Sequence, residues 1–214
     1  MSQTLTFLGG DSGFGENNNS AFYVDGKKLI LIDCGFAIFN KVKNILKEFD
    51  EIDVIITHLH NDHAGTLSQL IMYEYFVLGK TVNVISKCER IYDYLDITGT
   101  PKDAYNIYNS TEYVKLIKTE HVKELDSYGM SLKLDGKNII YTGDTNSLES
   151  FFPYFECADE LYVDVSKSSN VHLIISDILD KLNDIHNNGT EVFLMHVDDK
   201  EYVKEYVKGK YKIM

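Results

Sequence analysis

Three histidines and one aspartate stand within six residues, directly after an apolar run, in the segment IITHLHNDHAG at positions 55–65. His58 and His60 are two positions apart, so an extended backbone points both side chains to one side. Asp62 and His63 follow too closely to share that side, which favours a loop that wraps ligands around more than one ion. Imidazole suits Zn, Fe, Ni or Cu, and a carboxylate can bridge two cations. Because the chain has only 7 histidines in 214 residues, this clustering predicts a metal site rather than a polar surface turn.

Metal-capable residues also follow two later apolar runs. Asp144 comes after the expected strand 138–142, and His196 comes after the expected strand 191–195. Taken alone, Asp144 would cap a turn and His196 would be an ordinary satisfied or exposed histidine. The ends of adjacent strands converge in space, however, so these residues and the cluster at 58–63 are expected to share one cleft.

Hydrophobic periodicity supplies the elements that would position these residues. In the first half we expect strands at 4–8, 20–24, 29–32, 52–56 and 81–85, with helices at 37–49 and 67–78. The second half repeats this order, with strands at 113–117, 130–134, 138–142, 161–165 and 191–195 and a helix at 173–186. The pattern predicts an α/β protein that forms a four-layer αββα sandwich, as a single domain over residues 1–214 built of two similar β-rich halves.

The N-terminal segment, the lengths of the apolar runs and the cysteines indicate the cellular compartment. The N-terminal segment MSQTLTFLGG has no basic region followed by a long apolar stretch, and no run approaches the roughly 20 apolar residues that cross a bilayer. We therefore expect a cytoplasmic protein with no membrane partner. Cys34, Cys88 and Cys157 are odd in number and far apart, which favours reduced thiols over a disulfide framework. The sequence leaves a homodimer open.

Charge argues against an extended nucleic-acid surface. The formal net charge is −12, and Arg90 is the only arginine. Broad nucleic-acid binding depends on Lys and Arg side chains that neutralise phosphates and release counterions. A phosphate substrate is still allowed, because a pair of metal ions can reverse the field inside one cleft.

Four motifs in order resemble those of the metallo-β-lactamase fold superfamily: HLHNDH, the isolated His121, TGDT with Asp144, and LMHVDD with His196. The resemblance covers nearly the whole chain. It implies that one metal is held by His58, His60 and His121, and a second by Asp62, His63 and His196, with Asp144 bridging the two. It therefore implies two divalent metal ions, with Zn as the first expectation and Mn or Fe as alternatives.

Details of the motifs favour one branch of the superfamily. Secreted β-lactamases are disfavoured because no signal peptide is evident and Asp144 stands where the best-known group has a cysteine ligand. Glyoxalase II-like thioesterases have a different turn after the third histidine. The interval from His121 to Ser127-Tyr128-Gly129, together with the segment LILIDCG, is more similar to the ribonuclease Z and phosphodiesterase branch. The long inserted arm with which ribonuclease Z holds tRNA has no counterpart here.

The resemblance also suggests catalytic residues. Asp62 would position the nucleophile as well as bind metal, and His172 would protonate the leaving group, with Asp164 as its partner; a histidine with no such role is an equal alternative for His172. The expected activity is a dinuclear metallohydrolase in which a bridging hydroxide attacks a small-molecule or short oligonucleotide phosphate ester. The alternatives are a thioester or lactone hydrolase, and a non-catalytic binding or sensor protein on the same fold.

Overall fold

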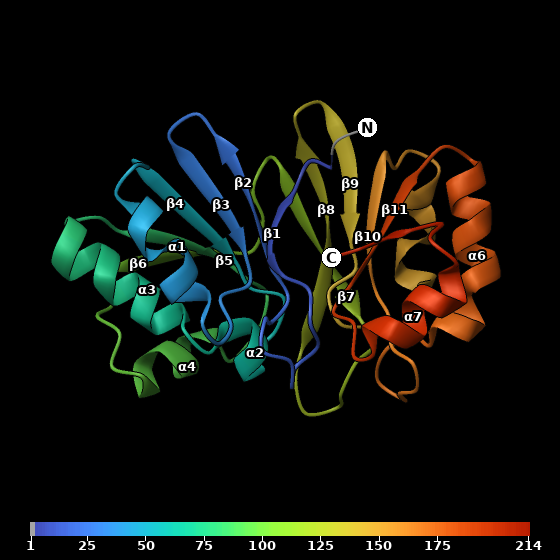
Figure 1. Cartoon of the computed structure of the whole chain (residues 1–214). Helices are drawn as coiled ribbons and strands as arrows, with labels where there is room; N and C mark the ends of the chain where they lie inside the picture. The colour runs from blue at the N-terminus through green and yellow to red at the C-terminus, as the bar shows by residue number, and fades with distance from the viewer. Residues whose placement is uncertain (1–2) are drawn as a thin grey trace.

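A computed structural model describes residues 3–214 as two six-stranded sheets that face each other, with helices on both outer sides (Figure 1). The first sheet has the strand order β1 (Thr6–Gly9), β2 (Ser20–Asp25), β3 (Lys28–Ile32), β4 (Glu51–Ile55), β5 (Val82–Ile85), β6 (Tyr105–Tyr108). The second has the order β12 (Lys212–Ile213), β11 (Glu191–Met195), β10 (Glu160–Asp164), β9 (Lys137–Tyr141), β8 (Ser127–Leu134), β7 (Val114–Thr119).

Both sheets follow the same rule. Their first three strands in chain order are antiparallel, and each later strand is added in parallel. The carboxyl ends of the parallel strands in a sheet lie at one edge, which is where ligands bind in α/β folds. The metal-capable residues of the sequence follow the ends of these strands.

Helices form the two outer layers (Figure 1). On the outer side of the first sheet lie α1 (Ile38–Leu46), α3 (Leu67–Tyr73), a π-helix η1 (Glu74–Leu78) and α4 (Ile91–Ile97). On the outer side of the second lie α6 (Ile175–Asn187) and α7 (Lys200–Val207), and the remaining short helices are α2 (Asn61–Ala64), η2 (Glu149–Phe151) and α5 (Phe152–Phe155). The predicted α/β class and its four layers are therefore confirmed.

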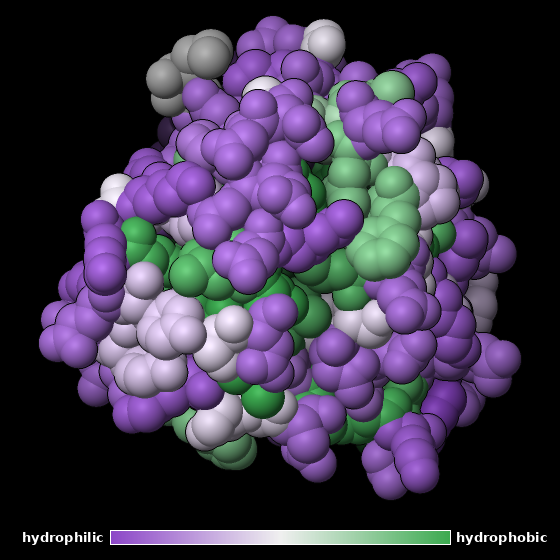
Figure 2. Space-filling view, turned by 90° about the vertical axis from the view of Figure 1, so that its right-hand side faces the viewer, coloured by the Kyte–Doolittle hydropathy of each residue, from purple (hydrophilic) through white to green (hydrophobic). Residues whose placement is uncertain are grey.

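Strand alternation divides the core into an inter-sheet layer and an outer layer. In β10, Tyr162 points to the first sheet and stacks on Phe7 of β1 with ring centroids 5.4 Å apart. Its neighbours Leu161 and Val163 point the other way and belong to the cluster that includes Ile185 of α6. The two sheets therefore pack through their inner faces, while hydrophilic residues cover most of the outer face shown in Figure 2.

Some elements differ from the sequence prediction. Helices α4 and α7 and the edge strands β6 and β12 were not predicted, because each is short and buries few residues; α7, for example, buries only Val203 and Val207. Strand β8 begins at Ser127 rather than at 130 and includes Gly129, where a Cβ would lie 2.3 Å from the carbonyl oxygen of Thr142. Within residues 3–214, no helix is long and apolar enough to cross a membrane.

Candidate metal centre

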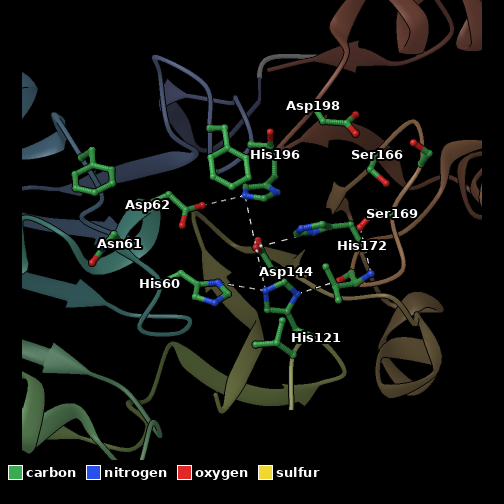
Figure 3. Close-up of a pocket in the computed structure, with 17 residues that line it drawn as sticks. His60, Asn61, Asp62, His121, Asp144, Ser166, Ser169, His172, His196 and Asp198 are labelled. Atoms are coloured by element: carbon green, nitrogen blue, oxygen red, sulfur yellow. Dashed lines mark hydrogen bonds and ion pairs between the residues drawn. The ribbon is translucent and has the colours of Figure 1, made fainter. Parts of the chain in front are cut away.

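A cleft of about 550 Å³ lies at the sheet edge where the parallel strands end, and metal-capable side chains line its floor (Figure 3). Two metal-capable side chains come shortly after β4, because His58 and His60 lie on the turn that leads into α2; His60 lines the cleft, and His58 is fully buried. From the second sheet, Asp144 follows β9 and His196 follows β11. The structure thus brings the predicted residues from distant parts of the sequence into one place.

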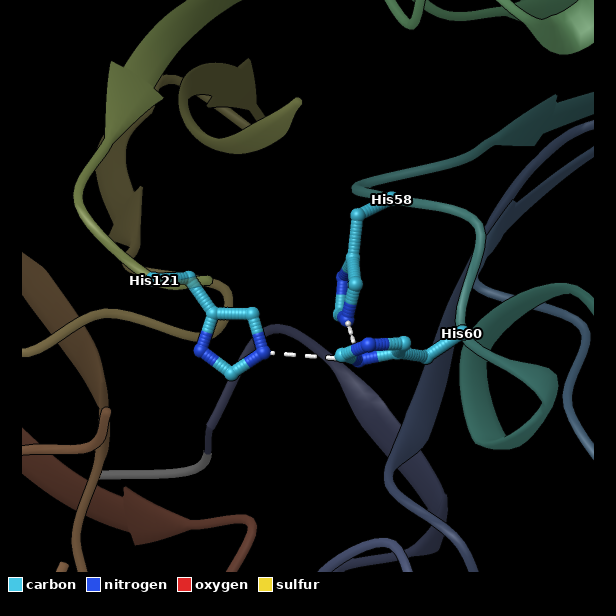
Figure 4. A group of neighbouring side chains, drawn as sticks. All are labelled: His58, His60 and His121. Atoms are coloured by element: carbon cyan, nitrogen blue, oxygen red, sulfur yellow. Dashed lines mark hydrogen bonds between the residues drawn. The ribbon is translucent and has the colours of Figure 1, made fainter. Parts of the chain in front are cut away.

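The first cluster consists of His58, His60 and His121 (Figure 4). Nε2 of His58 lies 3.0 Å from Nδ1 of His60, and Nε2 of His121 lies 3.4 Å from that same Nδ1. The three nitrogens therefore converge on one point from two different sheets. Three imidazoles in this arrangement suit a transition metal such as Zn.

The second cluster lies beside the first and contains a carboxylate. Oδ2 of Asp62 is 3.0 Å from Nε2 of His63 and 3.3 Å from Nε2 of His196. Gly35 makes this placement possible, because its Cα packs so closely on the Asp62 backbone that a Cβ there would lie 1.7 Å from the Asp62 carbonyl oxygen. Asp62, His63 and His196 together with Asp144 form a second group of converging ligand atoms.

Asp144 lies between the two clusters. Its Oδ2 atom is 3.7 Å from Nε2 of His58 and 3.8 Å from Nε2 of His121 in the first cluster, and 3.4 Å from Nε2 of His63 and 3.5 Å from Nε2 of His196 in the second. Its Oδ1 atom is buried and has no hydrogen-bond partner among the described residues. A buried carboxylate oxygen in a ring of imidazoles is costly unless a cation compensates it, so these residues fit a metal pair.

Two further carboxylates orient the imidazoles of the second cluster. Nδ1 of His63 donates to Oδ2 of Asp33 at 2.8 Å, and Nδ1 of His196 donates to Oδ1 of Asp164 at 3.2 Å. Each proton on Nδ1 leaves the Nε2 lone pair free to face the centre, as in the carboxylate–histidine pairs of metal sites. The second cluster is therefore set in the tautomer that binds metal.

The first cluster is oriented by neutral groups. Nδ1 of His121 donates to the carbonyl oxygen of Val171 at 3.0 Å, and Nδ1 of His58 lies 3.1 Å from Oγ1 of Thr57. These contacts also leave the Nε2 atoms facing the centre.

Asp33 was not predicted as a site residue, although it follows a strand in the same way as Asp144 and His196. It is fully buried, and its Oδ1 atom accepts hydrogen bonds from the backbone nitrogen and Oγ1 of Thr57, both at 2.9 Å. Asp33 and His196 both have left-handed backbone angles, with φ of 61° and 54°. Such strain in non-glycine residues persists where the surroundings over-determine it, often at functional sites.

The electrostatics of the cluster reflect burial and the central carboxylate. Burial, aided by the charge of His63, holds the pKa of His58 well below its usual value. Burial also opposes the charged form of His63, yet the carboxylates of Asp144 and Asp33 outweigh it and hold the pKa of His63 well above its usual value. For Asp144, burial is outweighed by the surrounding imidazoles, chiefly those of His196 and His63, which hold its pKa well below the usual range.

His172 lies at the side of the cleft, where its Nδ1 atom is 4.0 Å from Oδ2 of Asp144 (Figure 3). Its Nδ1 atom donates to Oδ2 of Asp164 at 2.8 Å, so the Asp164–His172 contact expected from the sequence is present. Burial opposes the charged form of His172, but Asp164 outweighs it and raises the pKa of His172. His186 does not line the cleft, and its Nδ1 atom lies 3.1 Å from the carbonyl oxygen of Thr190.

The rest of the cleft wall was not predicted. It has two phenylalanines, Phe14 and Phe36, and a polar side that includes Ser166, Ser169 and Asp198. Within the described chain, no lysine or arginine belongs to this lining. Positive charge inside the cleft would therefore come from bound metal and from protonated histidine.

Comparison with solved structures identifies the architecture. The chain aligns with the metallo-β-lactamase fold protein YhfI from Bacillus subtilis over 98% of its own length and 95% of that chain, at a TM-score of 0.76 and 20% identity. A diphosphatase from the PhnP family aligns over 98% of this chain and 94% of its own, also at a TM-score of 0.76, with 16% identity. The chain has the metallo-β-lactamase fold, with candidate metal-binding clusters of histidine and aspartate at the sheet edge.

Sequence comparison gives a more particular relationship. Residues 3–95 match a family model described as "Anti-Pycsar protein Apyc1". A protein of that name from Bacillus phage 010DV004 is 26% identical over 91% of this chain and 89% of its own length.

Proposed function

We propose that this protein is a dinuclear, metal-dependent phosphodiesterase that acts on small phosphate diesters. The observation that carries the proposal is the position of Asp144, whose Oδ2 atom lies 3.4–3.8 Å from imidazole nitrogens of both clusters. A carboxylate in that position can bridge two cations, and the remaining residues divide into three ligands on each side.

The division of ligands follows the geometry. His58, His60 and His121 would hold one ion, Asp62, His63 and His196 would hold the other, and Asp144 would serve both. Zn is our first choice, and Mn and Fe are alternatives. When bound, a metal pair supplies Lewis acidity and a hydroxide at neutral pH.

The chain's own side chains would complete the reaction. Asp62, at the edge of the second cluster, would accept a hydrogen bond from the attacking nucleophile and orient it. His172 would donate a proton to the departing oxygen, because Asp164 orients its ring and favours its charged form. Since Asp164 also contacts His196, one carboxylate would couple the proton donor to the second cluster.

The cleft indicates the size and charge of the substrate. A volume of about 550 Å³ is in the range of small-molecule sites. The cleft wall offers no cationic side chain from the described chain, which favours a diester with one negative charge over a polyphosphate. The name anti-Pycsar protein that similar proteins carry fits an enzyme that degrades a cyclic nucleotide, so we propose cyclic nucleotides as the first substrates to test.

Metal analysis combined with a substrate panel tests the proposal. We expect about two metal ions per chain, with hydrolysis of bis-p-nitrophenyl phosphate and of 3′,5′-cyclic nucleotides by the metal-loaded protein. Faster turnover of thioesters or lactones would favour that class of hydrolase instead. If the metal-loaded protein hydrolyses none of these substrates, a binding or sensor function is favoured instead.

A further inference from the structure

Strand β8 begins with Ser127, Tyr128 and Gly129, three residues that do not line the cleft. The strand pairs with β7 so that Ser127 lies opposite Thr119. Both side chains are buried, with exposed fractions of 2% and 7%. Ser127 and Thr119 therefore place two buried hydroxyl groups side by side where β7 ends and β8 begins.

The two hydroxyl groups converge on the backbone of Asp144. Oγ of Ser127 donates to the carbonyl oxygen of Asp144 at 3.2 Å, and Oγ1 of Thr119 donates to the same oxygen at 3.1 Å. A carbonyl oxygen has two lone pairs, so these two bonds use its whole accepting capacity. Two donors from neighbouring strands thus fix the direction of this carbonyl group in the residue that lies between the metal clusters.

The backbone of β8 also packs against the turn that carries Asp144. A Cβ at Gly143 would lie 2.5 Å from the carbonyl oxygen of Tyr128, and a Cβ at Gly129 would lie 2.3 Å from the carbonyl oxygen of Thr142. Gly143 has a left-handed φ of 58°, a conformation that side chains rarely adopt. Because the two segments touch at both places, a shift of the turn 142–144 would require a shift of β8.

Strands β7 and β8 also reach two histidines of the first cluster. The backbone nitrogen of Tyr128 donates to the carbonyl oxygen of Thr57 at 3.1 Å, directly before His58. On the neighbouring strand, His121 follows Thr119 after one intervening residue. The contacts of β7 and β8 therefore join the segments that carry two ligands of the first cluster to the segment that carries the candidate bridging carboxylate.

We propose that Thr119 and Ser127 are positioning residues, whose hydroxyl groups hold the carboxylate of Asp144 in register with the first histidine cluster. This inference rests on the metal centre of the proposed function and specifies which residues keep it in shape. Functional groups of a site must be held to within about 0.5 Å of their working geometry. The ligands here come from two different sheets, so contacts between the sheets have to supply that precision.

Metal affinity tests the proposal without requiring turnover. Thr119→Val and Ser127→Ala each remove one hydroxyl group and leave the ligand side chains in place. We expect each variant to bind Zn about 10- to 100-fold more weakly in competition with a chelator, the scale found for residues that orient metal ligands. Thr119→Ser keeps the hydroxyl group and should restore the affinity of the wild type.

Thr190→Val is the matched control, because it removes the same kind of bond outside the cleft. Oγ1 of buried Thr190 donates to the carbonyl oxygen of Ala158 at 2.9 Å. The melting temperature of the metal-free protein should fall as it does in Thr119→Val, while the affinity for Zn should equal that of the wild type. Equal losses of Zn affinity in the two variants would reduce the role of Thr119 to general stability and overturn the proposal.

Zn binding and turnover distinguish this inference from the proposed function. If Thr119→Val and Ser127→Ala lose Zn affinity but the wild type hydrolyses no diester, the positioning role stands and the phosphodiesterase proposal fails. If the wild type hydrolyses diesters and both variants bind Zn as tightly as it does, the positioning role is refuted and the phosphodiesterase proposal stands. A wild type that binds neither Zn nor Mn would overturn both.

Discussion

At the scale of single residues, the geometry of His172 predicts an effect that depends on the leaving group. Its Nδ1 atom is held by Asp164 at 2.8 Å, so the rest of the ring is oriented in the cleft. His172→Ala should lower kcat by about 10²–10⁴-fold for a cyclic nucleotide, whose alkoxide leaving group needs a proton, and much less for bis-p-nitrophenyl phosphate. Steady-state kinetics on both substrates measures the difference.

His186→Ala is the matched control, because His186 lies outside the cleft. Its kinetics should equal those of the wild type on both substrates. Equal losses for the two substrates in His172→Ala would assign His172 a role other than proton donation.

The central position of Asp144 predicts a loss that is shared by both metal sites. Its Oδ2 atom lies 3.7 Å from His58 and 3.5 Å from His196, one in each cluster. Asp144→Ala should therefore reduce the metal content from about two ions per chain to below one, as measured by plasma emission spectrometry after dialysis. Asp198→Ala removes another cleft carboxylate and should retain both ions. A variant that loses only one ion would place Asp144 in a single site.

At the scale of elements, the junction between β3 and α1 predicts a link between packing and metal binding. Gly35→Ala would place a Cβ 1.7 Å from the Asp62 carbonyl oxygen, so the segment that carries Asp62 must shift. We expect a loss of stability of about 1–3 kcal/mol, the usual scale of overpacking, together with weaker metal retention.

The hairpin glycine Gly26 provides the control for this variant. A Cβ there meets nothing within 4 Å, but φ is 57°, so Gly26→Ala strains only the turn between β2 and β3. It should lower the melting temperature and leave the metal content unchanged. Full metal content in Gly35→Ala would show that the Asp62 segment adapts to the extra atom.

Helix η1 contains a buried acid that predicts a pH dependence of stability. Glu74 is fully buried, its carboxylate oxygens have no hydrogen-bond partner among the described residues, and burial raises its pKa to about 7 against the opposing charge of Lys80. From about pH 4.5 to 7 the folded state thus binds a proton that the unfolded state has released. This group therefore destabilises the fold progressively as pH rises through that range.

Glu74→Gln removes the titration while keeping the shape of the side chain. Its melting temperature should exceed that of the wild type at pH 8, and the difference should shrink towards pH 5. Thermal denaturation at the two pH values measures this, with the exposed Glu156→Gln as the control. A difference that is the same at both pH values would mean that Glu74 does not titrate in this range.

The elements also show what the sequence could and could not predict. His58, Asp144 and His196 could be located because each follows an apolar run, and parallel strands bring such ends together. The supporting role of Asp33 could not be predicted, because it depends on a left-handed backbone angle and on the approach of Thr57 and His63 from a distant segment. Short helices such as α7 could not be predicted either, because two buried valines give too weak a hydrophobic periodicity.

At the scale of the whole molecule, charge predicts which phosphate substrates are turned over. The net charge is −12, and the cleft wall contains no lysine or arginine from the described chain. A polyanion such as a precursor tRNA would thus be repelled at long range and would find few cations to replace its counterions. We expect small diesters to be cleaved with a kcat/KM far above that for precursor tRNA.

Salt dependence provides a second measure of the same property. A nucleic-acid enzyme that neutralises Z phosphates loses affinity with a slope of about −0.9 Z in log–log plots against salt, or about −0.7 Z for single strands. Because attraction here would come mainly from bound metal at short range, the slope of log kcat/KM for a cyclic nucleotide between about 50 and about 200 mM KCl should be close to zero. Efficient cleavage of precursor tRNA with a steep negative slope would instead require a basic surface, and would favour tRNA processing as the function of this protein.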